Sequence, residues 1–447
     1  MEKINEMIRE DIDKLIKSKR IKCSQNTNEE IIFRNINFNQ HFNFTDNILK
    51  IDKTDISNFL YDRNNNQIDI SGIKEVIFEN CSFNYLPTIN NTNIWLIRFA
   101  KCTINDCQSI VSLLKQNNIN KKVYFNNCTL DDLSFGDIRD IKYNSNIELC
   151  YFQINGGSIR NLTIENIELV SKLYFNRNND APMIIDNLKI KGSIFKENFK
   201  LHKCEVKKVS ISDSDFEKQF DCYGSTFIQG CNDTDKTIYF KTLNIKGLFI
   251  FDSVTFNQKV KFEYVTFESS GNFRYSTFKK GLDLDSTNIQ EDKIINFHGV
   301  QELDKKSSII ETSQETYRII KHNFEKLGNK IESNKFHSLE LNANRRELWS
   351  SCESGLCERK IVSLFHFISS NHSQSWIISL VWIFIISLIT SLLLCDTFNN
   401  WHYKAEYLSI LAEIKLSDKP WIFLFHKVSL GYLYYQFLTA VRKDTRK

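Results

Sequence analysis

A histidine and a glutamate stand three residues apart in the C-terminal third of this 447-residue chain, at His337 and Glu340. Di-iron carboxylate sites use this separation on a helix, but with the glutamate first and with further carboxylates on neighbouring helices. The order here is reversed, and no second pair or companion carboxylate is evident in the sequence. We therefore expect no metal at these two residues.

Two cysteines and two histidines follow further along the chain, at Cys352, Cys357, His366 and His372. Zinc is held by such sets when the spacing within each pair is short. The C-x4-C and H-x5-H spacings found here lie at the wide edge of the usual ranges, and both histidines fall in or beside an apolar stretch. We predict reduced thiols beside a membrane in place of a zinc site, with palmitoylation as a weaker alternative.

Short motifs for phosphate, dinucleotide or acyl-transfer chemistry do not occur in the sequence: there is no G-x-x-x-x-G-K-[ST], no G-x-G-x-x-G and no G-x-S-x-G. Asp283 and Asp285 would point the same way on a strand, and we interpret them as part of a solvated face. The sequence therefore predicts no enzyme, no cofactor and no metal.

A ladder of large apolar residues, spaced alternately five and six apart, dominates the middle of the chain. Its members are Phe240, Ile245, Phe251, Phe256, Phe262, Phe267, Phe273, Phe278, Leu284, Ile289 and Ile295. A period of eleven fits neither a helix nor one short strand, and a fixed repeat indicates a solenoid. Since one turn cannot bury its own large side chain, stacked turns would form a common core. We interpret the ladder as core and not as a binding surface.

The residues between the ladder positions also repeat, as "DSVTFNQKVKF", "EYVTFESSGNF" and "RYSTFKKGLDL". The residue two before each central Phe is small or β-branched: Val254, Val265 and Ser276. This pattern resembles the pentapeptide-repeat family. The resemblance implies a mainly β fold, a right-handed β-helix of roughly square cross-section with one pentapeptide on each face. Alanine is nearly absent at the small position and alternate repeats carry a sixth residue, which implies a wider or less regular coil.

We expect the solenoid over residues 32–300, most regular over 240–295 and looser over 33–199. The five-six-five spacing is also present near its start, at Phe33, Phe38, Phe44 and Leu49. Polar stretches at 62–67, 116–121 and 228–239 would be loops that project from the stack. An amphipathic helix over residues 1–22 would cap the first turn, because the end turns of a solenoid need shielding.

The apolar period becomes helical over residues 311–350, which we expect to form an amphipathic linker, with Thr312 capping its start and Glu315 as capping-box partner. The linker would cap the last turn and run to the membrane; a short coiled coil is the alternative.

The C-terminal region, residues 363–447, is predicted to be a membrane region. Residues 376–395 contain no charge and are long enough to span about 30 Å of hydrocarbon. Residues 420–441 are rich in aromatic and aliphatic side chains but contain His426 and Lys427. Basic residues flank both segments on the sides that a hairpin would leave in the cytoplasm, so the positive-inside rule favours two transmembrane helices.

Charge is divided unevenly along the chain. Residues 1–310 carry 41 basic and 41 acidic side chains, whereas residues 311–447 carry 17 and 13. A neutral solenoid lacks both the basic surface that phosphate backbones require and the acidity of a protein that imitates DNA. The sequence therefore argues against a nucleic-acid partner and against a DNA-mimicking topoisomerase inhibitor.

The order of solenoid, polar helix and two apolar segments resembles bacterial membrane proteins that carry pentapeptide repeats. We therefore expect a non-catalytic scaffold at the inner membrane, with solenoid and C-terminus cytoplasmic. Its partners would be membrane lipid and either another protein or copies of itself. The alternative is an oligomeric two-span channel or pore-type effector with a sensing solenoid, in which Lys427 or His426 faces a wet lumen. Residues 396–419 contain no glycine, so a potassium-type filter is not expected.

Overall fold

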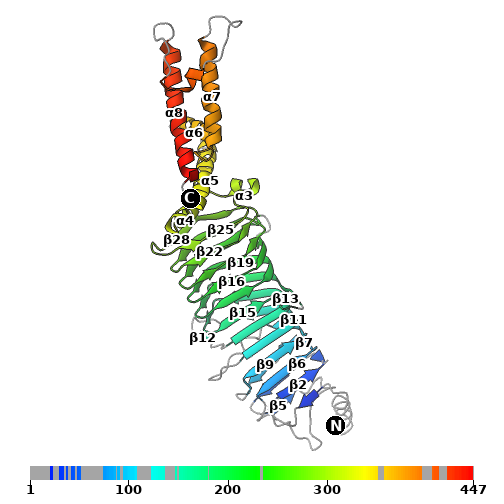
Figure 1. Ribbon diagram of the computed structural model, residues 1–447. Coiled ribbons are helices and arrows are strands. Elements are labelled where there is room, and N and C mark those ends of the chain that lie inside the picture. The colour runs from blue at the N-terminus through cyan, green and yellow to red at the C-terminus, as the bar shows by residue number, and fades with distance from the viewer. Residues whose placement is uncertain are drawn as a thin grey trace, which may run out of the picture. The chain divides into compact units, whose positions relative to one another are not determined.

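The computed structural model describes residues 21–23, 30–34, 37–38, 42–45, 48–51, 74–86, 88–90, 94–107, 122–135, 146–147, 151–179, 181–231, 235–350, 357–394, 405–411 and 420–445. The chain divides into two compact units, Met1–Glu311 and Thr312–Lys447. The first is a parallel β-solenoid, and the second is helical (Figure 1). The predicted fold class of a mainly β solenoid followed by helices is confirmed.

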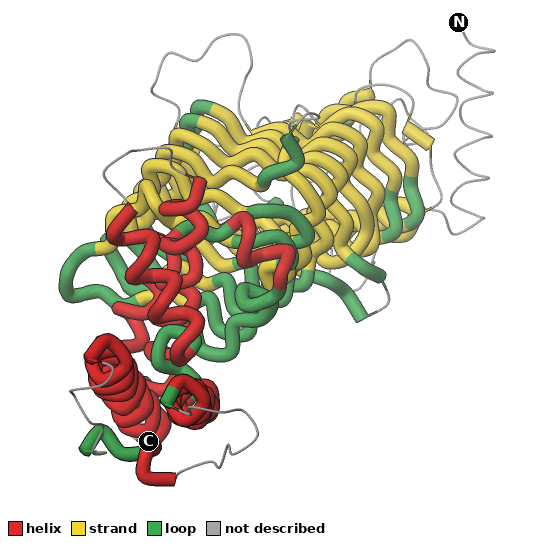
Figure 2. The backbone as a smooth tube through the Cα atoms, turned by 90° about the horizontal axis from the view of Figure 1, so that it is seen from above, coloured by secondary structure: helices red, strands yellow, loops and turns green. Residues whose placement is uncertain are grey.

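Four columns of strands, each hydrogen-bonded in parallel from turn to turn, make up the solenoid, as the stacked turns in Figure 2 show. The first column contains β2 (Glu30–Arg34), β6 (Glu75–Glu79), β9 (Leu96–Ala100), the first parts of β11 (Lys122–Phe135) and β13 (Tyr151–Glu165), β15 (Lys172–Asn176), β18 (Phe199–His202), β20 (Phe220–Asp221), β23 (Phe249–Ile250), β26 (Gly271–Asn272) and β29 (Ile295–Asn296). The second contains β3 (Asn37–Phe38), β7 (Ser82–Tyr85), β10 (Thr103–Cys107), the middle of β11 and β13, β16 (Met183–Lys191), β19 (Cys204–Phe216), β21 (Thr226–Gly230), β24 (Thr255–Phe256) and β27 (Thr277–Phe278).

The longest strands turn a corner and continue into the next column. The third column contains the last parts of β11 and β13, the end of β16, the middle of β19 and the first parts of β22 (Ile238–Ile245), β25 (Val260–Phe267) and β28 (Leu282–Ile289). The fourth contains β12 (Asn146–Ile147), β14 (Glu168–Leu169), β17 (Ile194–Phe195) and the ends of β19, β22, β25 and β28.

The register explains the spacing of the apolar ladder. Phe240 pairs with Phe262 and Phe256 pairs with Phe278, so equivalent positions in successive turns lie 22 residues apart. Their rings stack at centroid distances of 4.8 and 5.2 Å. Two steps of five and two of six therefore complete one turn, with one ladder residue on each column. This geometry is compatible with a repeat β-helix.

The ladder from Phe240 to Leu284 lies inside the coil, where each side chain is at most 1% exposed. Ile289, in the last turn, is only partly buried. Each full burial of such a side chain is worth about 1.5–3 kcal/mol. The stacked core therefore supplies the main stabilisation of this unit.

Small residues two positions before a ladder residue also point inward. The thiols of Cys102, Cys128 and Cys204 donate weak hydrogen bonds to main-chain carbonyls of the preceding turn, at 3.4 Å each. Ser225 does the same with its hydroxyl, at 2.6 Å from the carbonyl oxygen of Leu201. Small residues fill this position on the second column, whereas Phe249 and Leu243 fill the corresponding inward position on other columns.

The two ends of the solenoid are covered by different elements. At the start, β1 (Ile21–Cys23) pairs antiparallel with β2 and covers its free edge. The predicted capping helix over 1–22 lies outside the described residues except for Ile21 and Lys22, which belong to this strand. At the other end, α3 (Lys306–Glu311) covers the last turn, where Ser308 donates to the carbonyl of Phe278 at 2.7 Å.

The early five-six-five spacing does not continue as coil. β4 (Phe42–Thr45) and β5 (Ile48–Ile51), which contain Phe44 and Leu49, form an antiparallel pair, and β4 also pairs with β8 (Thr88–Asn90). The expectation that all four residues share one ladder is wrong, because a tight reversal of the chain gives the same spacing as a corner. The predicted loops at 62–67 and 116–121 lie outside the described residues. The predicted loop at 228–239 is shorter, since β21 extends to Gly230 and β22 starts at Ile238.

The helical unit contains α4 (Gln314–Lys326), α5 (Lys330–Ser350), α6 (Cys357–Ser370), α7 (Trp376–Leu393), the 3-10 turn η3 (Ala405–Leu408) and α8 (Pro420–Thr445). The predicted linker over 311–350 is a pair of antiparallel helices, because the chain reverses at Gly328, whose φ of 72° ends α4. Ser313, and not Thr312, caps α4, with its hydroxyl accepting from the amide of Thr316 at 3.1 Å.

One helix among the described residues, α7, is long and apolar enough to cross a membrane. Its bounds agree with the predicted span at 376–395. The second predicted segment, 420–441, is also a single helix, α8, but its average hydropathy is lower and it contains the charged residues Lys427, Arg442 and Lys443.

Candidate functional site

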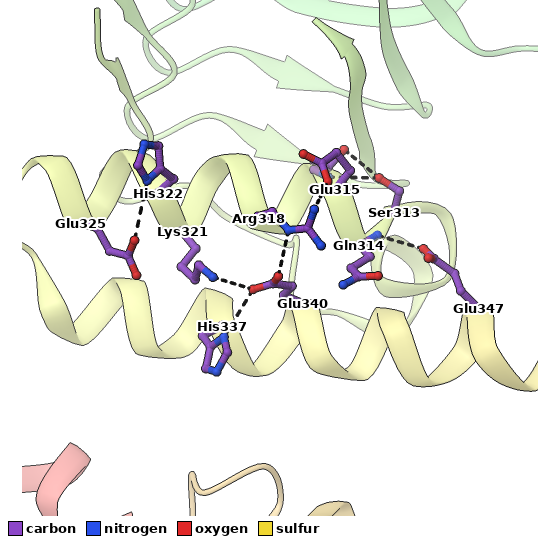
Figure 3. Close-up of polar contacts among 11 residues, drawn as sticks. Ser313, Gln314, Glu315, Arg318, Lys321, His322, Glu325, His337, Glu340 and Glu347 are labelled. Atoms are coloured by element: carbon purple, nitrogen blue, oxygen red, sulfur yellow. Dashed lines mark hydrogen bonds and ion pairs between the residues drawn. The ribbon is translucent and has the colours of Figure 1, made fainter. Parts of the chain in front are cut away.

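In the helical unit, several charged and polar side chains surround one nearly buried carboxylate, that of Glu340. Glu340 on α5 accepts hydrogen bonds from two cations of α4, Arg318 at 3.2 Å and Lys321 at 2.9 Å (Figure 3). His337, one turn earlier on α5, lies 3.3 Å away through its Nδ1. Arg318 also binds the exposed Glu315 at 2.6 Å. The cluster ties the two antiparallel helices together.

Glu340 is held as an anion by these neighbours. Burial opposes its charge, but the hydrogen bonds from His337, Lys321 and Arg318 outweigh burial and lower the pKa of Glu340 to about 2. Two cations already occupy the carboxylate, so a metal ion would meet repulsion as well as competition. His337 and Glu340 are therefore brought together as an ion cluster. Within the described part of the chain, no group of three potential metal ligands exists.

The turn between α6 and α7 holds a buried polar cluster. His366 and His372 lie with their Nδ1 atoms 3.1 Å apart, so one ring donates to the other. The hydroxyls of Ser370 and Ser373 both donate to Oε1 of Gln436 on α8, at 3.0 and 2.9 Å. Gln436 thus fixes the turn against α8.

The backbone of this turn is unusual, since Asn371, His372 and Ser373 have φ values of 48°, 58° and 58° in succession. Left-handed backbone costs roughly 1–2 kcal/mol for a residue with a side chain. The hydrogen bonds to Gln436 and the burial of His372, which is 1% exposed, hold the turn in place.

The two histidines of the Cys and His set, for which zinc was considered and not expected, are adjacent in the structure. Cys352 lies outside the described residues. Cys357 stands nine residues before His366 on the same helix, which separates their backbones by about 13 Å. Burial lowers the pKa of both His366 and His372, the latter to about 4, so both rings are neutral at pH 7.

The contact between α7 and α8 combines an apolar cluster of Ile383, Ile386, Leu430 and Leu433 with small and polar side chains. Ser379, Ser387, Thr390 and Ser391 of α7 are buried, and His426, Leu430, Leu433, Gln436 and Ala440 of α8 are buried at helical spacing. Thr390 and His426 hydrogen-bond across the contact at 3.1 Å. Small residues and hydrogen bonds of this kind are typical of helix pairs in membranes.

The opposite faces of the same helices are exposed and apolar. These residues are Ile377, Val381, Phe384, Leu388 and Leu392 on α7, and Trp421, Leu424, Phe425, Val428 and Leu438 on α8. A soluble helix pair presents polar and charged side chains to its surroundings. This pair instead has an apolar outer face, and its interior combines the polar side chains with an apolar cluster of Ile383, Ile386, Leu430 and Leu433.

The two polar side chains that a pore would use are engaged within the chain. His426 is fully buried, and its second ring nitrogen lies 3.3 Å from the carbonyl oxygen of Ser409. The ammonium of Lys427 donates to the carbonyl of Ile410, which follows η3.

The outer surface of the solenoid carries an aromatic patch that we did not predict. It consists of Tyr124, Tyr151 and Tyr174 on β11, β13 and β15, whose rings lie 5.6 and 5.3 Å apart. The ammonium of Lys200 lies 5.3 Å from the centre of the Tyr174 ring. Tyr151 also donates to Gln153 at 2.7 Å. The signal was present in the sequence as a Tyr-Phe pair repeated in three strands: where Phe points inward, the preceding Tyr must point outward.

The two aspartates of β28 and the cysteines of the solenoid occupy positions that a structural role explains. Asp283 and Asp285 lie on the outer surface of β28, where the amide of Asp285 donates to Asp283 at 3.2 Å. Seven cysteines of the solenoid are free thiols, and all of them except Cys231 are buried. A hydrogen bond with Cys128 raises the pKa of Cys102 to about 12, so its thiol stays protonated at pH 7.

Comparisons of the whole chain with protein-family models, with curated proteins and with solved structures gave no match.

Proposed function

We propose that this chain is a non-catalytic scaffold, anchored in a membrane by its helical unit and presenting its solenoid as a rigid surface to another protein. The observation that carries the proposal is the apolar outer face of α7 and α8 around a partly polar interior. Two adjacent helices that bury Ser, Thr, His and Gln beside a few Ile and Leu side chains, and expose further Ile, Leu, Phe and Trp, are stable when their surroundings are apolar.

Both helices would cross the membrane as a hairpin. α8 has one charged residue between Pro420 and Val441, Lys427, and its long side chain reaches a carbonyl, which reduces the penalty for burying the charge. Arg359 and Lys360 precede α7, and Arg442 and Lys443 end α8. By the positive-inside rule both flanks, and with them the solenoid, would be cytoplasmic. Together with the resemblance to bacterial membrane-anchored repeat proteins, this favours an inner membrane.

α6 would lie at the membrane surface. Its exposed side chains Ile361, Val362, Phe365 and Ile368 recur at helical spacing on one face, whereas its first turn carries Glu358 and Arg359. Such a helix binds in the interface between headgroups and acyl chains.

The aromatic patch is the surface that we assign to the protein partner. Tyrosine is enriched in protein interfaces because it offers a large rigid contact area together with a hydroxyl. A photo-cross-linking residue at Tyr174 should capture the partner in cells, whereas the same residue at Lys261, on the outer surface of β25, should not.

A topology assay tests the anchor. A reporter active only in the cytoplasm is fused after Lys447 and, in a second protein, inserted beside Asn399. We expect activity at Lys447 and none at Asn399, in a chain that only detergent extracts from membranes. Activity at neither site would mean a single span, and extraction without detergent would refute the membrane anchor.

A further inference from the structure

A cavity of about 450 Å³ opens between the beginning of α5 and the end of α8. Three of its lining residues are cations: Lys330 on α5, and Arg442 and Lys443 on α8. Glu325 is its one acidic residue, and that carboxylate already accepts from the hydroxyl of Ser333 at 3.3 Å. The cavity therefore carries an excess of positive charge.

Two of these cations, Lys330 and Lys443, are the ones that the described contacts leave for a ligand. Neither Lys330 nor Lys443 has a side-chain ion pair among the residues that the structure describes, and Lys443 is partly buried. Burial lowers the pKa of Lys443. Basic residues at the end of α8 also complement that helix's dipole. That role does not account for Lys330, which begins a different helix and faces the same cavity.

The position of the cavity along α8 indicates the depth of its ligand. The indole of Trp376, at the start of α7, packs on the ring of Phe437 with centroids 6.3 Å apart. Tryptophan at the end of a span lies at the boundary between hydrocarbon and headgroups. Lys443 follows Phe437 by six residues, which is about 9 Å along the helix. Since the headgroup layer is roughly 5–8 Å thick, this depth corresponds to lipid phosphates.

We propose that this cavity binds the phosphate of an anionic phospholipid, with Lys330, Arg442 and Lys443 as its cationic ligands. This inference rests on the proposed membrane anchor, because it takes the ligand from the bilayer and not from solution.

Native mass spectrometry of the full chain in detergent, with equal amounts of phosphatidylglycerol and phosphatidylcholine, tests the inference. We expect the wild-type chain to retain phosphatidylglycerol preferentially. Each cation near an anionic headgroup contributes about fivefold to affinity, so Lys330→Gln with Lys443→Gln should reduce the preference roughly 30-fold. Lys330→Arg with Lys443→Arg should keep it, since the charges remain.

Arg359→Gln with Lys360→Gln is the matched control, because it removes two cations from α6, which does not line the cavity. Its preference should stay within about threefold of the wild type, as exposed charges contribute little. Equal losses in the control and the cavity variant, or no preference in the wild type, would overturn the inference while leaving the anchor intact. Displacement of the lipid by soluble glycerol phosphate at similar concentration would also overturn it, since the source would then be solution. A chain that stays soluble without detergent would refute both proposals.

A second readout reports on the cavity from inside the protein. The charge of Lys443 contributes to the lowered pKa of both His366 and His372. A bound phosphate would offset that charge, so both histidines should titrate at higher pH with phosphatidylglycerol than with phosphatidylcholine. In Lys443→Gln the lipid-dependent difference should shrink, and a difference that is unchanged in this variant would contradict the proposed site.

Discussion

Replacing Glu340 by glutamine should loosen the pair of helices α4 and α5 at neutral pH. The carboxylate is the common acceptor for Arg318, Lys321 and His337, and its side chain is 8% exposed. Each tenfold change in proton affinity corresponds to about 1.4 kcal/mol. A pKa lowered from 4.5 to about 2 therefore corresponds to about 3 kcal/mol of stabilisation of the charged form. Since Arg318 is half exposed, we expect a loss of about 2–3 kcal/mol.

Hydrogen exchange of the full chain in detergent measures this loss locally. Amides of α4 and α5 should exchange roughly 30- to 150-fold faster in Glu340→Gln than in the wild type. Glu315→Gln is the matched control, because Glu315 also binds Arg318 but is 45% exposed. An exposed ion pair contributes at most about 1 kcal/mol. Equal effects of the two substitutions would refute the assignment of the stabilisation to the buried carboxylate.

The sign of the pH dependence gives a second check. The folded-state pKa of Glu340 is lowered, so its contribution is fully present above the unfolded value near 4.5 and is lost as the pH falls toward 2. The difference in stability between the wild type and Glu340→Gln should therefore shrink over that range. A difference that stays constant down to pH 2 would show that the substitution acts through packing and not through charge.

Two further substitutions test the core of the solenoid and the turn between α6 and α7. Phe262→Ala should lower the free energy of unfolding by about 3–5 kcal/mol in urea titrations, because the ring is fully buried. The control is Lys261→Ala at the neighbouring outward residue, which should change the free energy of unfolding by less than about 0.5 kcal/mol. Similar values for the two variants would contradict the inward ladder. His372 has a pKa lowered to about 4, so the wild type should lose up to about 3 kcal/mol through this residue as the pH falls from 6.5 to 4. In fluorescence-monitored unfolding His372→Asn, which tolerates a positive φ, should reduce this slope and leave the smaller contribution of His366. An unchanged slope would assign the titration to another group.

The regular half of the solenoid could be predicted because its repeat is local. In residues 240–289 each ladder residue follows the preceding corner at a constant spacing. The spacing alone therefore predicts the column on which each residue lies and its register with the next turn. The beginning of the chain could not be resolved in this way. Phe44 and Leu49 have the same spacing as coil residues, but they lie on an antiparallel pair, and only the partners of each strand distinguish a hairpin from a corner.

The polar clusters of the helical unit could not be predicted from the sequence for a related reason. His337 and Glu340 could be placed on one helix face from their separation, but Arg318 and Lys321 reach Glu340 only because Gly328 reverses the chain. Similarly, the contact of Gln436 with Ser370 depends on tertiary packing between segments 66 residues apart. The pairs that determine the chemistry of these groups are long-range, and periodicity carries no information about them.

The distribution of polar residues in α7 and α8 also explains why the two helices differ in average hydropathy although both expose apolar surfaces. Hydropathy sums over the whole circumference, whereas a surrounding bilayer would contact only the outer face. In α8 the polar residues His426 and Gln436 are buried and hydrogen-bonded, so they lower the average without placing polar groups on the outside. The solenoid solves the opposite problem, with phenylalanine inside and amides and charges outside. That one chain carries both arrangements is the physical basis for expecting the solenoid in water and the pair α7–α8 in lipid.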